Sequence, residues 1–202
     1  MSPELPSAER VHSDERVRED FSMEVGERRF VVTVLSPQPD RLAPAPALLL
    51  AFAGARESTL FREPYNYAPN AFLAAGHRTL SFDFVGHGEA INHFGEGIHG
   101  LRNSLMGGVD PFVVFAEEAR AVIDTCVQRG LATVGHIVTS GTSRGGYMAL
   151  YALARDERIA AAAGFAPVTD WRVLAEFEAD VAQPRVAALA LSGYAGRLAG
   201  RS

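Results

Sequence analysis

A continuous apolar run, Ala-Leu-Leu-Leu-Ala-Phe at residues 47–52, constrains the fold more than any other feature of the chain. Six apolar residues without polar alternation are typical of a strand that is buried on both faces of a sheet. Such strands occur in parallel sheets, whose strands are joined by crossover helices. The run therefore predicts a parallel sheet that is covered by helices on both faces.

The rest of the chain repeats this alternation. Further strands are expected at residues 78–84, 136–140 and 159–165, and helices at residues 68–75, from about 111 to 129, and 145–155. Asp110 and Pro111 form an N-cap and a first-turn proline, and Gly130 ends the helix that they begin. Strand and helix alternate four times, which predicts an α/β fold with a doubly wound, mostly parallel sheet.

The N-terminal part differs from this pattern. Residues 21–25 and 28–35 predict two strands of a β-hairpin, with Gly26 and Glu27 at the turn. Residues 36–46 contain four prolines and predict an irregular connection. Residues 1–20 are polar and charged, and they predict a flexible, solvated arm. The chain is therefore divided into a flexible arm, residues 1–20, and one domain, residues 21–202.

Composition narrows the classes of function. The chain has 202 residues, of which 48% are hydrophobic and 21% charged, as in an ordinary globular domain. Its net charge of −5 gives no electrostatic basis for binding nucleic acid. No apolar run is long enough to cross a bilayer, and no signal peptide is recognised. The single cysteine, Cys126, excludes an internal disulfide and a cysteine-rich metal site, and we expect a cytoplasmic setting without metal or cofactor.

The segment Gly141-Thr142-Ser143-Arg144-Gly145 lies between the strand at 136–140 and the helix at 145–155. A Gly-x-Ser-x-Gly segment in this context makes a sharp turn that raises the serine above the carboxyl edge of the sheet, where ligands bind in α/β folds. The two glycines avoid side-chain collisions where the strand and the helix converge. Ser143 is therefore the candidate nucleophile. The alternative is a glycine-rich turn in which the serine is incidental.

Over residues 45–172 the chain resembles the α/β-hydrolase superfamily. Besides the serine turn, three segments match that superfamily in the right order. Residues 52–55, Phe-Ala-Gly-Ala, resemble its oxyanion loop, although Ala53 replaces the usual histidine. Residues 83–88, Asp-Phe-Val-Gly-His-Gly, resemble the turn after its next strand. Residues 165–171, Phe-Ala-Pro-Val-Thr-Asp-Trp, resemble the strand exit of prolyl-oligopeptidase-like and dienelactone-hydrolase-like members.

The resemblance implies roles for several residues. The backbone N–H groups of Ala55 and Arg144 are expected to bind the oxyanion of an acyl-transfer intermediate. A serine of this type also needs an acid and a histidine, which follow the serine in this superfamily. No histidine follows Ser143, because all six precede it. We therefore expect the domain to be incomplete at its C-terminus, with the last strands of the fold missing. A divergent member with different chemistry is the alternative.

Other residues have both a functional and a structural interpretation. Asp170 follows a strand exit and is a candidate acid, although a structural role is typical of that position. His87 belongs to a structural turn. His93 and His99 lie in a glycine-rich segment that is a candidate lid, and their spacing fits no helical metal pair. Arg56 follows the oxyanion loop, where it either holds a substrate carboxylate or remains a solvated surface residue.

The sequence thus predicts a serine hydrolase that cleaves an ester, thioester or peptide-like acyl bond through an acyl-enzyme on Ser143. Its expected partner is a small-molecule or peptide acyl substrate, and neither nucleic acid nor membrane is expected to bind. The oligomeric state stays open. Two alternatives also stay open: a non-catalytic hydrolase-like scaffold, which the missing histidine favours, and a serine-dependent acyltransferase.

Overall fold

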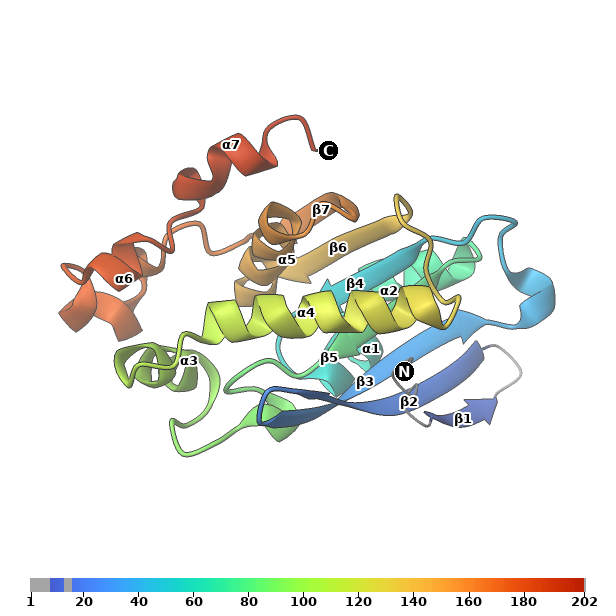
Figure 1. Cartoon of the computed structure of the whole chain (residues 1–202), viewed down its shortest axis with the longest axis horizontal. Coiled ribbons are helices and arrows are strands. Elements are labelled where there is room, and N and C mark those ends of the chain that lie inside the picture. Colours follow the sequence, from blue (N-terminus) through green and yellow to red (C-terminus); the bar gives the residue numbers. More distant parts are fainter. Residues whose placement is uncertain (1–7, 13–15, 202) are drawn as a thin grey trace.

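The computed structural model describes residues 8–12 and 16–201, which form a seven-stranded sheet with helices on both faces (Figure 1). The strand order is β1-β2-β3-β5-β4-β6-β7. The first three strands and the β3–β5 pair are antiparallel, whereas β5, β4, β6 and β7 run parallel to one another. The strands are β1 (Ala8–His12), β2 (Arg16–Val25), β3 (Arg28–Pro37), β4 (Leu48–Phe52), β5 (Arg78–Phe82), β6 (Ile137–Thr142) and β7 (Ile159–Phe165).

The apolar run forms the central parallel strand, as predicted. All five residues of β4 are buried, and β4 lies between β5 and β6. Its last residue, Phe52, packs edge-on against Phe82 of β5 at 5.3 Å and against Phe115 at 5.0 Å between ring centroids. Aromatic pairs in this geometry add to the stabilisation that burial alone provides. Aromatic rings of β4, β5 and α4 (Pro111–Gln128) therefore pack together where β4 ends.

Helices cover the two faces of the sheet. In Figure 1, α4 and α5 lie on the face towards the viewer, and α1 and α2 lie behind the sheet. The helices are α1 (Arg56–Phe61), α2 (Tyr67–Ala74), α3 (Gly97–Met106), α4 (Pro111–Gln128), α5 (Arg144–Arg155), α6 (Pro184–Ala187) and α7 (Ala195–Leu198). Short 3₁₀ turns are η1 (Pro39–Arg41), η2 (Gly88–Ala90), η3 (Trp171–Val173), η4 (Ala175–Asp180) and η5 (Leu191–Tyr194).

The N-terminus of α4 has the predicted cap. Oδ1 of Asp110 accepts hydrogen bonds from the backbone N–H groups of Phe112 (2.9 Å) and Val113 (3.2 Å), and Pro111 occupies the first turn. These bonds satisfy N–H groups that would otherwise have no partner within the helix. The predicted apolar stripe of α4 is buried, including Cys126, and burial raises the pKa of its thiol to about 12. Cys126 is thus an inert core residue.

The segment after β7 is anchored by aromatic packing. Trp171 of η3 is fully buried, and its ring lies 4.9 Å from Phe112, 5.2 Å from Tyr147 and 5.6 Å from Phe177 between centroids. The tryptophan therefore ties the exit of β7 to α4, α5 and η4.

Among the residues that the structure describes, no helix is long and apolar enough to cross a membrane.

The prediction of a flexible arm over residues 1–20 is wrong for the residues that the structure describes there. Residues 8–12 form β1, and residues 16–20 begin β2, which pairs with β3 from Arg16 opposite Pro37 to Val25 opposite Arg28. Charged side chains of β2 form ion pairs. Glu19, for example, is only 5% exposed and pairs with Arg129, the C-cap residue of α4. Residues 1–7 and 13–15 lie outside the described residues.

Beyond that N-terminal stretch, the predicted hairpin is confirmed, with Gly26 at its turn. Its second strand continues two residues past the predicted end, to Pro37. The strand extends because Ser36 and Pro37 pair with Val17 and Arg16 of β2. On its other side it pairs with β5 from Val32 opposite Phe82 to Leu35 opposite Thr79, so the hairpin is part of the main sheet.

One carboxyl group is buried under the hairpin. The side chain of Glu118 in α4 is 0% exposed, and its Oε1 lies 2.5 Å from Nε of Arg28. Its other oxygen, Oε2, has no hydrogen-bond partner. Burial raises the pKa of Glu118 to about 7, and the charge of Arg28 only partly offsets that effect. The ionised carboxylate is therefore less stable here than in water.

We expect the contribution of Glu118 to the stability of the protein to fall as the pH rises. Its folded pKa lies above the unfolded value of 4.5, so its contribution is full below about pH 4.5 and is lost as the pH rises through about 7. The shift corresponds to roughly 3 kcal/mol of unfolding free energy. His87, whose pKa is lowered to about 4, contributes a slope of the opposite sign, so the effect of Glu118 is measured as a difference. Urea unfolding between pH 4.5 and 8 should show the stability of the wild type falling relative to that of Glu118→Gln. An equal slope in both proteins, or its loss in the exposed control Glu117→Gln, would contradict the assignment.

Candidate active site

The Gly-x-Ser-x-Gly segment forms the predicted strand-to-helix turn. Ser143 lies between the end of β6 and the start of α5, and its side chain is exposed. Its φ of 56° and ψ of −117° are unusual for a residue other than glycine. The neighbouring backbone holds this conformation: the N–H of Ser143 donates to the carbonyl of Phe165 (2.9 Å), and the N–H of Val168 donates to the carbonyl of Ser143 (3.1 Å). Strained backbone of this kind is typical of functional sites.

The glycines of the turn are required by close backbone contacts. A Cβ on Gly141 would lie 2.1 Å from the carbonyl oxygen of Gly145, and a Cβ on Gly145 would lie 2.0 Å from the carbonyl oxygen of Phe52. Both distances are far shorter than any non-bonded contact allows. The end of β4, the end of β6 and the start of α5 therefore meet at a point where no side chain fits.

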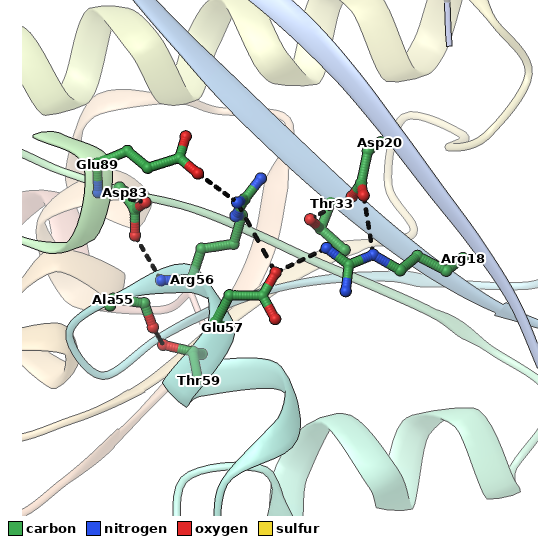
Figure 2. Close-up of polar contacts among 9 residues, drawn as sticks. All are labelled: Arg18, Asp20, Thr33, Ala55, Arg56, Glu57, Thr59, Asp83 and Glu89. Atoms are coloured by element: carbon green, nitrogen blue, oxygen red, sulfur yellow. Dashed lines mark hydrogen bonds and ion pairs between the residues drawn. The ribbon is translucent and has the colours of Figure 1, made fainter. Parts of the chain in front are cut away.

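The segment after β4 is held by hydrogen bonds on both sides of Ala55. The carbonyl of Ala55 accepts from the N–H (2.9 Å) and Oγ1 (2.9 Å) of Thr59, and the N–H of Arg56 donates to Oδ1 of Asp83 (2.5 Å), as Figure 2 shows in part. Within the described residues, no hydrogen bond occupies the N–H of Ala55. This amide is therefore not part of the sheet ladder.

Asp83 anchors two segments at once. Besides the N–H of Arg56, its carboxylate accepts from the N–H of Glu89 (3.0 Å), and a Cβ on Gly88 would collide with it. Sequence reasoning assigned Asp83 only to its own turn. The buried carboxylate in fact connects the segment after β5 to the start of α1 beside Ala55. The only sequence feature that could have indicated this role is the position of Asp83 at the start of the Asp-x-x-Gly-His-Gly segment.

Ala55 and Arg144 line one cavity of about 250 Å³. Its wall comes from the segment after β4, the segment after β5, the start of α3 and the start of α5. The lining residues are Ala53, Gly54, Ala55, Ser58, Tyr65, Gly86, His87, Gly88, Glu96, Gly97 and Arg144. We call it the polar cavity. Ser143 is not itself among these lining residues, and the cavity meets the serine turn at Arg144.

An apolar cavity of about 260 Å³ lies on the other side of the turn. It is lined by Ala51, Phe52, Pro64, Tyr65, Tyr67, Ala68, Ser140, Gly141, Thr142 and Phe165. Tyr65 borders both cavities. Ser143 is exposed and stands between the two cavities in chain order. Gly141 and Thr142, just before it, line the apolar cavity, and Arg144, just after it, lines the polar cavity.

His87 is buried in the wall of the polar cavity. Its Nδ1 lies 3.1 Å from the carbonyl oxygen of Val85, so Nδ1 carries the proton and donates it. Burial lowers the pKa of His87 to about 4, with a smaller lowering by the charge of Arg144, so the imidazole is neutral at pH 7. Its Nε2 has no hydrogen-bond partner. Sequence reasoning gave this histidine only a structural role in its turn and did not place it beside Ala55.

The structure does not bring a histidine and Ser143 together. In the part of the chain that the structure describes, no imidazole forms a hydrogen bond with the hydroxyl of Ser143. His99 lies exposed on α3 and His93 lies exposed beside Phe94. The glycine-rich segment that was a candidate lid, residues 86–108, contains η2 and the helix α3. The described residues also contain no group of three or more metal-ligating side chains.

Asp170, the candidate acid, is engaged with a close neighbour. Its carboxylate accepts from the N–H (3.0 Å) and the guanidinium (2.6 to 3.1 Å) of Arg172, which lowers the pKa of Asp170. It caps η3, and within the described residues no histidine bonds to it. The acid role of Asp170 therefore remains a prediction without a histidine partner in this part of the chain.

The two expectations for Arg56 are corrected. Arg56 is 6% exposed and therefore is not a solvated surface residue. Its guanidinium points towards Glu89, with 3.2 Å between the ion-pair atoms, and lies 3.7 Å from Glu57 (Figure 2). It is not part of the wall of the polar cavity, so it does not hold a substrate group there. Burial against two acidic side chains was not visible in the sequence.

Comparison with known proteins identifies the fold. The sequence model of the prolyl oligopeptidase family matches residues 113–189, which include the serine turn. None of the curated proteins compared with the chain matches it by sequence. Among solved structures, an acetyl xylan esterase from Paenibacillus sp. R4 is similar with a TM-score of 0.66 and 16% identity, over 97% of this chain and 63% of that one.

Two further structures resemble this chain. Acetyl xylan esterase 1 from Thermoanaerobacterium sp. JW/SL YS485 has a TM-score of 0.66 and 17% identity, over 96% of this chain and 70% of that one. A cold-adapted esterase from an Arctic intertidal metagenomic library has a TM-score of 0.59 and 22% identity, over 80% of this chain and 65% of its own length. The chain thus has the α/β-hydrolase fold and spans less than two thirds of the length of this metagenomic esterase.

Proposed function

We propose that the protein is a serine hydrolase that cleaves an ester, thioester or peptide-like acyl bond through an acyl-enzyme on Ser143. The strained turn supports this proposal most directly. Ser143 is exposed at a positive φ, held by backbone hydrogen bonds and flanked by two glycines that no larger residue can replace. A turn of this kind presents a nucleophile at the carboxyl edge of a parallel sheet.

The surroundings of Ser143 support an oxyanion site. The N–H group of Ala55 has no partner in the described residues, and the N–H of Arg144 lies in the first turn of α5, where backbone amides lack partners within the helix. Both residues line the polar cavity. We propose that their amides bind the negative charge that develops on the acyl oxygen during attack by Ser143. The positive end of the α5 dipole adds to this stabilisation.

The base and the acid belong to the same proposal. Serine needs a base to become an effective nucleophile, and His87 is already engaged with Val85 and has no bond to Ser143. We propose that a histidine and an acid from residues beyond Ser202 complete the site. The esterases among the structural relatives suggest ester substrates first. An acyl acceptor other than water would make the protein an acyltransferase.

Covalent labelling tests the proposal. We expect a fluorophosphonate probe, with imidazole added as a diffusible base, to form a single adduct that peptide mass spectrometry maps to Ser143. Ser143→Ala should lose the adduct, whereas Ser58→Ala, which removes another hydroxyl near the polar cavity, should keep it. An adduct that persists in Ser143→Ala contradicts the proposal. No adduct in the wild type would instead favour the non-catalytic scaffold.

A further inference from the structure

The side chain of Arg144 has no role in the proposed chemistry, which uses only its backbone N–H. This guanidinium is half-buried and lines the polar cavity. It extends to the start of α3, where a Cβ on Gly97 would lie 3.3 Å from its Nη1. In the described residues, Arg144 forms no ion pair and its side chain makes no hydrogen bond. A partly buried guanidinium without a carboxylate partner is unusual, because its charge is poorly solvated there.

We propose that the polar cavity is a subsite for a carboxylate carried by the acyl group of the substrate, and that the guanidinium of Arg144 binds this carboxylate. The proposal rests on the proposed function and specifies its substrate class. Guanidinium and carboxylate groups match in geometry and form two parallel charge-assisted hydrogen bonds. The substrate class that follows is a half ester of a dicarboxylic acid, such as a succinyl or glutaryl ester.

The cavity contains one guanidinium, and among the described residues the carboxylates near it do not bond to it. Among the lining residues, only Arg144 and Glu96 carry a charge at neutral pH, because the imidazole of His87 is neutral there. Glu96 is exposed and forms no ion pair with Arg144 in the described residues. Glu176 acts on the charge of Arg144 only through space. Water screens the charge of the exposed Glu96 from Arg144 more strongly than it would screen a ligand carboxylate in contact with the guanidinium.

A second feature of the wall indicates that a polar ligand belongs there. Nε2 of His87 is a buried acceptor without a hydrogen-bond partner, and the ring packs beside Gly54. Buried polar atoms in folded proteins almost always have partners, so this acceptor calls for a hydrogen-bond donor on a bound group or a water molecule, which the carboxylate itself cannot supply because it only accepts. His87 is 6% exposed and therefore belongs to the fixed wall of the subsite.

The position of Arg144 determines where the carboxylate lies in the substrate. One residue supplies both the amide for the oxyanion and the guanidinium for the carboxylate, and a long flexible side chain separates these two groups. The carboxylate must therefore be several bonds from the ester carbonyl. Succinyl and glutaryl esters have this spacing, whereas acetyl esters lack the charged group and would leave the guanidinium unpaired.

Binding measurements without turnover test this inference. We would titrate the 202-residue protein with monomethyl succinate and with dimethyl succinate, following the Nε–H signal of Arg144 by NMR. Monomethyl succinate should bind on the order of tenfold more tightly, since charge-assisted hydrogen bonds are the stronger kind. It should also shift the Arg144 signal. Equal affinities for the two compounds, or an unchanged Arg144 signal, would overturn the inference.

Variants separate the subsite from the nucleophile. Arg144→Gln should lose the preference for monomethyl succinate and Arg144→Lys should keep part of it, whereas Glu96→Gln should strengthen binding because it removes the opposing charge. Ser143→Ala should retain the preference for monomethyl succinate while losing the fluorophosphonate adduct. The two experiments therefore distinguish a failure of the proposed nucleophile from a failure of the proposed carboxylate subsite. A preference that survives in Arg144→Gln would contradict the assignment of Arg144.

Discussion

Residues 1–202 are expected to hydrolyse p-nitrophenyl acetate far more slowly than an ordinary serine hydrolase does, and added imidazole is expected to raise the rate. Loss of one member of a catalytic triad costs roughly 10⁴ to 10⁶ in rate. All six histidines precede Ser143, and none bonds to its hydroxyl in the described residues. An exposed serine at a strained turn is accessible to a diffusible base, so free imidazole can take the place of the missing side chain.

The control for this experiment is Ser143→Ala, which should show no rate beyond that of imidazole in buffer. A chain that continues past Ser202 with an acid and a histidine should react at an ordinary rate without imidazole. Hydrolysis by residues 1–202 alone at an ordinary rate, lost on Ser143→Ala, would mean that a base is already present. Glu96→Gln, His93→Asn and His99→Asn would then identify it.

Gly145→Ala is expected to be the most destabilising single substitution near the site. The added Cβ would lie 2.0 Å from the carbonyl oxygen of Phe52 in the central strand, and only a backbone shift can relieve that contact. Both β4 and the start of α5 are buried, so such a shift disturbs the packing of the core. We expect a loss of about 4 kcal/mol or more of unfolding free energy, which is exceptional for one substitution.

Gly196→Ala provides the matched control, because a Cβ at this position in α7 meets no atom within 4 Å and its φ is not positive. Urea unfolding should place this variant close to the wild type. If Gly145→Ala unfolded within about 1 kcal/mol of the wild type, the close contact between β4 and α5 would not exist in solution, given that surface changes usually stay within such a range.

Elements with a local signal were predictable from the sequence. The apolar run of β4, the Asp110–Pro111 start of α4 and the turn at Ser143 each depend on residues that are adjacent in the chain. Burial on both faces, capping and close backbone approach all require particular residue types at fixed positions. These requirements explain why the central sheet and the serine turn agree with the sequence analysis.

The N-terminal strands were not predictable in the same way. Charge in residues 16–20 was taken as a sign of solvation, but pairing between distant residues compensates it. Arg18 forms an ion pair with Glu57, and Glu19 forms one with Arg129. A charged strand at the side of a sheet is stable when its side chains are paired and its backbone is bonded to a neighbour. Neither condition can be recognised from a single segment.

The polar cavity depends on tertiary structure for the same reason. Its wall combines residues from four segments, and the sequence did not show that His87 is buried there or that Arg56 pairs with Glu57 and Glu89. Sequence reasoning gave Arg56 the possible role of holding a carboxylate because it follows the oxyanion loop. In the structure, Arg144 is the guanidinium that reaches the cavity, because α5 begins beside its wall. The sequence does not show which of the two arginine side chains reaches the cavity, because that depends on tertiary structure.

A crystal structure of the protein after reaction with a methylphosphonate ester tests the central claim most directly. Such an adduct mimics the tetrahedral intermediate of acyl transfer. The account predicts a phosphorus atom bonded to Oγ of Ser143, with a phosphoryl oxygen that accepts hydrogen bonds from the N–H groups of Ala55 and Arg144 at about 3 Å. A phosphoryl oxygen that points to solvent, with either amide turned away, would contradict the proposed oxyanion site.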